Sequence, residues 1–307
     1  MKKRIQNRLA ESRFAFPVMI IYGLAVWLGA GTVTEGAYLQ LVFFVASTLL
    51  MMMLNNTNSL IRIYSRMVSC SFVAMTCAAT FLFSSLESCA TGMCFILFYL
   101  SLLRSYQDKR APGIAFYSFA CLGIASLFFV QILYFVPFLW ILMASNMMAL
   151  THRMFWATVL GLVMPYWFAV GYYVVTDQFD AFIDHFAELA QFEPLLQYEA
   201  LDIHRIATFG LVVLLAVIGI IHYMRNSYLD KIRTRMIFEM FITVDILSFV
   251  FIILQPQHFD NLLPIIIVNT SCLFAHYVAL TRTWLTNVTF IVMCLATLGL
   301  TIFNLMP

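Results

Sequence analysis

The longest segment of the chain that is rich in ionisable residues runs from Thr176 to Arg205 and reads TDQFDAFIDHFAELAQFEPLLQYEALDIHR. Within it, Asp180, Asp184 and Glu188 recur every four residues, and His185 follows Asp184. Residues three and four apart share one face of an α-helix, so carboxylates and an imidazole at this spacing could act as acid and base or hold a cation. Asp184, His185 and Glu188 are therefore the candidate catalytic residues.

A simpler interpretation of the same segment is an interfacial helix whose charged face is only solvated. Its apolar residues also fall at helical spacing and form another face: Phe179, Phe182, Ile183, Phe186, Leu189 and Phe192. Such an amphipathic helix between two membrane spans lies along the bilayer surface. No metal site is expected, because a helical His-x-x-Glu is only a fragment of a metal motif and zinc sites need closer Cys or His pairs.

A second group of chemistry-bearing residues lies inside apolar segments. Asp245 falls near mid-depth of the apolar run that follows Arg235, and an ionisable group there costs several kcal/mol unless it has a partner or a purpose. The next run returns through the membrane, and about 1.5 Å per residue places Asn269 and His276 at a similar depth. We predict that Asp245 pairs with Asn269 or His276, either as a structural hydrogen bond or as a proton or ion site.

Three further residues could bind substrate. Arg62 lies in LNNTNSLIRIYSR, where the asparagines suit a turn followed by a helix start, with Arg62 and Arg66 on one helix face. This segment is either a loop that its positive charges hold at the cytoplasmic surface, or a cytoplasmic pocket for a phosphate or lipid headgroup. Arg205, after the acidic segment, could hold a phosphate. Trp167 follows Pro165 in a run where the proline predicts a kink and a cavity towards the acidic helix.

The composition requires a membrane to position these residues. The 307 residues are 63% hydrophobic and 10% charged, and the mean hydropathy is +0.92. A soluble domain carries about 25% charged residues, so most of the surface faces hydrocarbon. The seven cysteines lie in apolar runs without a C-x-x-C pair, which predicts buried packing residues and no disulfides.

Apolar runs long enough to cross the bilayer predict an all-α polytopic bundle of about eleven spans. They lie near 15–33, 37–54, 66–85, 88–103, 113–129, 133–150, 155–175, 206–224, 236–255, 262–280 and 284–305. The stretch 113–150 would be about 57 Å long as one helix, so we divide it near Gln131. One domain, 1–307, is expected, because no linker or low-complexity segment interrupts the chain.

The basic residues predict the orientation. With the N-terminus in the cytoplasm, every Lys and Arg except Arg205 falls in an inner segment, as the positive-inside rule requires. The C-terminus is then external, and the acidic helix between spans seven and eight is external too. The basic N-terminus, MKKRIQNRLAESR, lacks a convincing cleavage site after its apolar run, so we expect a retained first span.

The runs LNNTNSLIRIYSRM and GIASLFFVQILYFVPFLWILM resemble a family of uncharacterised multi-spanning inner-membrane proteins from bacteria with two membranes. The resemblance implies a protein of the bacterial cytoplasmic membrane and carries no catalytic residue across. The span number and acidic external loops are also similar to integral-membrane glycosyltransferases that use lipid-linked sugars. Those enzymes place an essential acid in a long first external loop, whereas here that loop is a few residues around Glu35.

Three functions remain open from the sequence. The first is handling of a lipid-linked or envelope glycan or lipid substrate at the outer membrane face, with Asp184 or Glu188 as base. The second is a proton-coupled transporter or flippase that uses Asp245, and the third is a scaffold without chemistry. Nucleotide-binding, metalloprotease and serine-hydrolase motifs are missing. The expected partners are the bilayer and a lipid-linked substrate, with no nucleic acid, and the sequence identifies no cofactor.

Overall fold

A computed structural model of the chain describes residues 4–32, 36–191 and 201–306, and within these ranges all regular structure is helical. The α-helices are α1 (Ile5–Ala10), α2 (Ala15–Gly29), α3 (Tyr38–Asn58), α4 (Met67–Ala78), α5 (Leu86–Leu102), α6 (Pro112–Phe128), α7 (Val136–Ser145), α8 (His152–Val175), α9 (Phe179–Ala187), α10 (Ile203–Asn226), α11 (Ile232–Leu254), α12 (Phe259–Leu280) and α13 (Trp284–Leu305). Short 3₁₀ segments connect them: η1 (Thr80–Leu82), η2 (Leu103–Ser105), η3 (Val130–Phe135), η4 (Glu188–Ala190), η6 (Ser227–Leu229) and η7 (Pro256–His258).

Seven of the helices in the described residues are long and apolar enough to cross a membrane: α3, α5 with η2, α8, α10 with η6, α11, α12 with η7, and α13. Shorter apolar helices are α2, α4, α6, and η3 with α7. The predicted all-helical fold is thus confirmed for the described residues, and these seven helices are compatible with the membrane protein predicted from composition.

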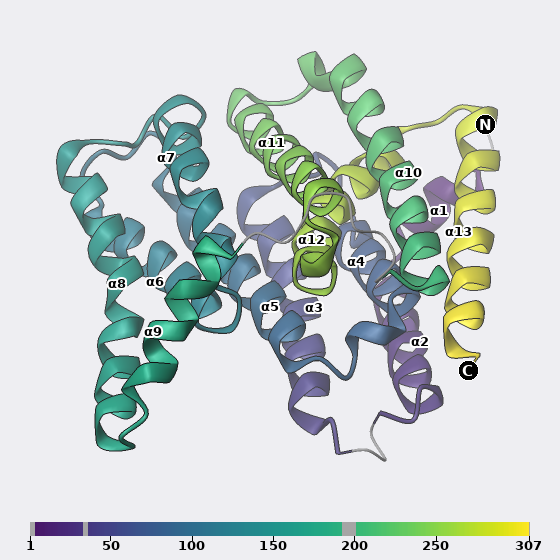
Figure 1. The fold of residues 1–307 in the computed structure, drawn as a ribbon. Helices are drawn as coiled ribbons and strands as arrows, with labels where there is room; N and C mark the ends of the chain where they lie inside the picture. Colours follow the sequence, from purple (N-terminus) through teal and green to yellow (C-terminus); the bar gives the residue numbers. More distant parts are fainter. Residues whose placement is uncertain (1–3, 33–35, 192–200, 307) are drawn as a thin grey trace.

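α12 is the centre of the bundle and packs against α4, α5, α10 and α11 (Figure 1). Its side chains are buried along almost the whole helix. Small and polar residues such as Asn269, Thr270 and Ser271 let neighbouring backbones approach, as in other membrane helix interfaces. At the crossing with α10, a Cβ on Gly219 would lie 2.9 Å from the backbone of Leu273.

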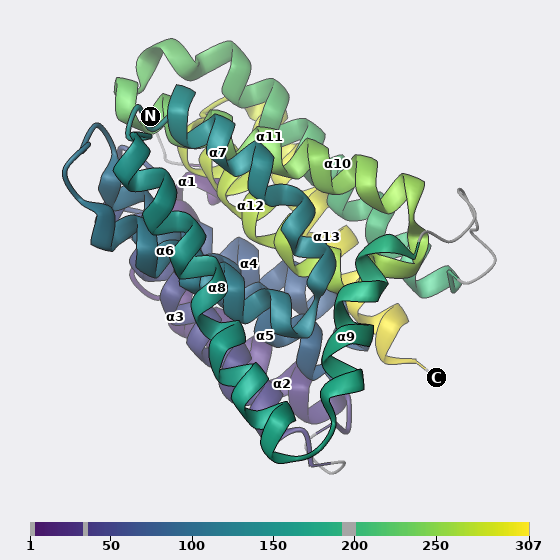
Figure 2. The ribbon, with the colours of Figure 1, turned by 60° about the vertical axis from the view of Figure 1, so that its left-hand side comes forward.

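α6 and α8 form a closely packed pair on one flank of the molecule, with α7 and α9 beside them (Figures 1 and 2). A Cβ on Gly161 would meet the carbonyl oxygen of Phe116 at 2.2 Å, and one on Gly123 would meet that of Leu162 at 2.6 Å. Gly161 therefore serves the helix crossing. α8 continues from His152 to Val175 as one α-helix with Pro165 inside it.

The chain divides near Gln131 as predicted. α6 ends at Phe128, Phe129 is extended, and the next helical segment starts at Val130. The backbone N–H of Gln107, before α6, donates to the carbonyl of Met147, after α7, at 2.9 Å. The start of α6 and the end of α7 therefore lie close together.

Hydrogen bonds define two opposite ends of the bundle. At the end that we call the Arg62 end, Arg233 of α11 donates to Asn58 of α3 (3.0 Å) and to the Leu103 carbonyl after α5 (2.9 Å). Arg4 before α1 reaches the Arg282 carbonyl (2.7 Å) after α12. At the other, Asp260 end, the start of α12 is tied to the starts of α5 and α10, and Thr80 after α4 donates to the Asn304 carbonyl of α13 (2.8 Å).

The predicted amphipathic helix is present as α9, followed by η4. Phe182 and Phe186 pack against Tyr166 of α8, with ring centroids 6.4 and 5.0 Å apart, whereas Phe179 and Ile183 are exposed. Its apolar face is thus partly used against α8. Phe192 of the predicted face lies outside the described residues, as does Glu35.

All seven cysteines are free, as expected. Cys70, Cys77, Cys94 and Cys272 are buried packing residues, and Cys89 and Cys121 are half-buried. Cys294 differs from the prediction because α13 lies at the edge of the bundle and leaves this thiol exposed.

Candidate functional site: a polar pocket at the Arg62 end

A polar pocket of about 460 Å³ opens at the Arg62 end, between the connection from α3 to α4 and the turn from α10 to α11. Its lining includes Asn55 and Asn56, residues 59–65, and Asp230 and Lys231. Pockets of roughly 300–1,000 Å³ with a few convergent polar groups are typical of small-ligand sites.

Local backbone geometry shapes one wall of this pocket. α3 continues through the asparagines and ends at Asn58, where Ser59 adopts a left-handed conformation (φ 49°). The Asn55 side chain then donates to the Ser65 carbonyl at 3.0 Å and folds the connection back on itself. The predicted helix start is therefore wrong, because α4 begins only at Met67 and Arg62 and Arg66 lie in non-helical backbone.

Arg62 contributes the first charge of the pocket. Its Nη1 donates to the Leu229 carbonyl at 3.2 Å and lies 3.8 Å from Oδ1 of Asp230. The Arg62 side chain remains 39% exposed, whereas that of Asp230 is 3% exposed. Lys231 is exposed on the same rim. Two cations and one carboxylate leave the pocket with net positive charge, which favours an anionic ligand.

His276 holds the carboxylate of Asp230 by a hydrogen bond from the protein interior. Its Nε2 donates to Oδ2 of Asp230 at 3.0 Å, and the imidazole is fully buried. The ring packs against Phe238 and Tyr223, with centroids 4.9 and 5.5 Å away, and against the ring of His222 at 5.5 Å. A carboxylate held in this way is oriented for acid/base work or for balancing Arg62.

The predicted partners of Asp245 are wrong. Oδ2 of Asp245 accepts from the hydroxyl of Thr270 at 3.0 Å, Asn269 accepts from Tyr99 at 2.7 Å, and His276 binds Asp230. All three residues have the expected burial. Within the described part of the chain, Oδ1 of Asp245 and Nδ2 of Asn269 are buried without a hydrogen-bond partner.

Asp184, His185 and Glu188 do not converge. The imidazole of His185 is half-buried and contacts the Ser126 carbonyl through Nε2 at 3.0 Å, whereas Asp184 and Glu188 are exposed. The residues of α9 and η4 thus point in two directions, with the histidine towards α6 and the carboxylates outwards. Among the described residues, no group of three or more His, Cys, Asp or Glu side chains could hold a metal ion.

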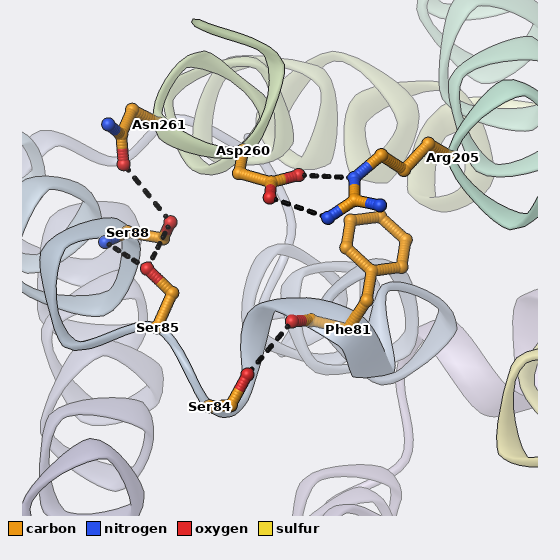
Figure 3. Close-up of polar contacts among 7 residues, drawn as sticks. All are labelled: Phe81, Ser84, Ser85, Ser88, Arg205, Asp260 and Asn261. Atoms are coloured by element: carbon orange, nitrogen blue, oxygen red, sulfur yellow. Dashed lines mark hydrogen bonds and ion pairs between the residues drawn. The ribbon is translucent and has the colours of Figure 1, made fainter. Parts of the chain in front are cut away.

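Arg205 is engaged by a carboxylate at the Asp260 end (Figure 3). Its Nε and Nη2 each donate to Asp260 at 2.9 Å, and its guanidinium lies 5.3 Å from the ring centroid of Phe81. Beside it, Ser88 of α5 donates to Asn261 at 3.2 Å. These contacts fasten the starts of α10 and α12 together and leave Arg205 a poor phosphate ligand.

Trp167 points away from the bundle, with 77% of its surface exposed on α8. None of the described residues that line the polar pocket belongs to α8. The cavity predicted behind Pro165 is therefore not this pocket, and Trp167 is an outward-facing aromatic of the kind found at membrane surfaces.

The sequence-based choice of candidates missed Asp230 and Lys231, which line the pocket, and His222, which packs against His276. The sequence could have pointed to Asp230, because it is the single acidic residue in NSYLDKIRTR, a segment rich in basic residues. Compared with known proteins, the chain matches no family model, no curated protein and no solved structure. The resemblance carried by residues 54–67 and 123–143 stays a prediction.

Proposed function

We propose that the chain crosses the bilayer about eleven times, with the Arg62 end in the cytoplasm and the C-terminus and α9 outside. The hydrogen bonds at the two ends support alternating helix directions, and the contact between Gln107 and Met147 supports two crossings by α6 and α7. α4 is only about 18 Å long, but it is buried among other helices, where adjoining non-helical backbone is tolerated. The positive-inside rule supports the orientation.

In this arrangement, we propose that the protein handles an anionic amphiphile of the bacterial envelope, a phosphate-bearing lipid or lipid-linked glycan precursor, in the cytoplasmic membrane. The observation that carries this proposal is the pocket of about 460 Å³ with Arg62 and Lys231 on its rim and Asp230 held by His276. Juxtamembrane basic residues attract anionic headgroups. We place the substrate at the Arg62 end because Asp184 and Glu188 are exposed and converge with no other candidate residue in the described ranges, and because Arg205 is paired with Asp260.

The pocket residues have distinct roles in this proposal. Arg62 binds a phosphate oxygen through its guanidinium, and Lys231 adds a second positive charge. Among the described lining residues Asp230 is the one carboxylate, and it accepts a proton from the headgroup if the protein is an enzyme. His276 positions Asp230.

Binding of phosphatidic acid by the purified protein tests the proposal. We expect Arg62→Gln and Lys231→Gln each to weaken binding by about tenfold, equivalent to about 1.4 kcal/mol. Arg153→Gln is the matched control, because Arg153 is an exposed arginine at the start of α8 outside the pocket lining. Equal binding by Arg62→Gln and the control would reject the site.

Proton-coupled transport is a second candidate, favoured by Asp245. Its side chain is fully buried in α11, and one carboxylate oxygen has no partner within the described part of the chain. A carboxylate in such surroundings is costly unless a proton or cation neutralises it. Transport by Asp245→Asn at the wild-type rate from acidic to alkaline pH would exclude this coupling.

A further inference from the structure

An apolar groove of about 410 Å³ runs along α4, between α2 and α13. Nearly all of its lining is hydrocarbon, with Val18, Met75 and Met293 among the side chains. Figure 1 shows α13 at the edge of the molecule near α2 and α10. Only Phe290, Thr297 and Thr301 of α13 are buried, and Phe290 and Thr297 belong to the wall that this helix gives the groove.

The groove is nearly as deep as the hydrocarbon of one lipid leaflet. Its lining runs from Ala15 to Tyr22 on α2 and from Met67 to Met75 on α4, or about 11 to 12 Å at 1.5 Å per residue. Half of a 30 Å hydrocarbon core is about 15 Å. The hydroxyl of Tyr22 donates to Thr301 at 3.0 Å and joins α2 to α13 at the deep end.

The shallow end of the groove adjoins the polar pocket. Ser65 lines the pocket and Met67 lines the groove, and two residues span at most about 7 Å of chain. On α12, Phe274 and Val278 line the groove at about the depth of His276, which binds Asp230 of the pocket from another face of the same helix. Positive charge at the mouth and hydrocarbon below it match the two parts of an anionic lipid.

We propose that this groove holds a hydrocarbon chain of the amphiphile whose anionic head occupies the pocket at Arg62 and Lys231. The inference rests on the proposed function and specifies its substrate class, a phosphate-headed lipid drawn from the leaflet at the Arg62 end. The net positive pocket selects anionic over zwitterionic heads, and the groove selects lipids over soluble phosphates.

Photocrosslinking tests this assignment. The protein is reconstituted in phosphatidylcholine nanodiscs with phosphatidic acid that carries a diazirine in one acyl chain, and labelled residues are identified by mass spectrometry. We expect labels on groove residues such as Met75 and Met293. Ala74→Trp, which places an indole in the groove, should reduce them about tenfold. Leu160→Trp, at a lipid-facing position of α8, is the matched control and should not reduce them.

Two comparisons separate this inference from the proposed function. Labelling of the groove by a phosphatidylcholine diazirine as strongly as by phosphatidic acid would overturn the inference. Labels spread evenly along α8 would overturn it too.

Binding of glycerol phosphate measured by calorimetry reports on the head site alone, and we expect Ala74→Trp to leave it unchanged. Glycerol phosphate binding as tight as that of phosphatidic acid would assign a soluble ligand and overturn the groove. Glycerol phosphate binding that Arg62→Gln does not weaken would reject the head site itself.

Discussion

At the residue scale, the contact between Asp230 and His276 is the most consequential pair in the polar pocket, because both side chains are nearly or fully removed from water. We expect Asp230→Ala to strand the buried imidazole, and His276→Phe to strand the carboxylate. Each should cost roughly 1–3 kcal/mol of unfolding free energy. The double variant should cost less than the sum, since neither unpaired group remains. Thermal unfolding in detergent measures this cycle, with Asp108→Ala, an exposed acid, as control; additive losses would contradict the pairing.

Arg205 provides the opposite case, an arginine that is already paired. Asp260 accepts hydrogen bonds from Nε and Nη2 of Arg205 and balances its charge. We therefore expect Arg205→Gln to leave phosphatidic acid binding within about twofold of the wild type, while the partly exposed pair contributes about 0–1 kcal/mol to stability. The binding assay with Arg62→Gln as the positive comparison checks this. A tenfold loss in Arg205→Gln would restore Arg205 as a phosphate ligand.

Sequence reasoning located the depth of buried polar residues better than their partners. The approximate depths of Asp245, Asn269 and His276 follow from the rise per residue, and all three are buried. Their pairing depends on rotation about the helix axis, where neighbouring residues differ by about 100°. That rotation directs Thr270, and not Asn269, to Asp245, and only the packing of α11 against α12 determines it.

At the element scale, the crossing of α6 and α8 depends on the absence of a side chain at Gly161. We expect Gly161→Ala to destabilise the protein by about 1–3 kcal/mol, because its Cβ would overlap the Phe116 carbonyl. Gly171 lies in the same helix with nothing within 4 Å of an added Cβ. Gly171→Ala should therefore stabilise the protein by roughly 0.5–1 kcal/mol. Equal melting temperatures for the two variants would contradict this crossing.

Helices were easier to predict than their ends. Apolar runs locate the helices because hydrocarbon-length segments must satisfy their own backbone hydrogen bonds. The residues Asn55, Asn56 and Asn58 misled because asparagine favours several backbone states. Here Asn55 and Asn58 close α3 by bonding the Ser65 and Leu54 carbonyls. In α8, Pro165 indicated a kink, whereas the close approach to α6 that Gly161 permits was not predicted.

At the scale of the whole molecule, hydropathy does not distinguish a central helix from a lipid-facing one, because lipid and protein interior are both apolar. α13 and α12 are both apolar enough to span, yet α12 is buried on all sides and α13 is largely exposed. The small and polar residues at 269–271 are the signal in the sequence that identifies α12 as central. Which helices pack around it, namely α4, α5, α10 and α11, depends on side-chain contacts. The hydrophobic periodicity of one sequence does not determine these contacts.

Site-directed labelling tests the number of crossings and the orientation together. In a variant with the exposed Cys294 and the half-buried Cys89 and Cys121 replaced by Ala, one cysteine at a time is introduced at the exposed positions Asp108, Met148 and Gln178. Each variant is probed with an impermeant maleimide on intact and on permeabilised cells. We expect Gln178→Cys to react in intact cells, and Asp108→Cys and Met148→Cys only after permeabilisation, because α6 and α7 return the chain to the same side. Opposite sidedness of residues 108 and 148 would leave one crossing there and contradict about eleven. Reversal of all three would keep the crossings but place the Arg62 pocket, and any lipid bound in it, in the outer leaflet.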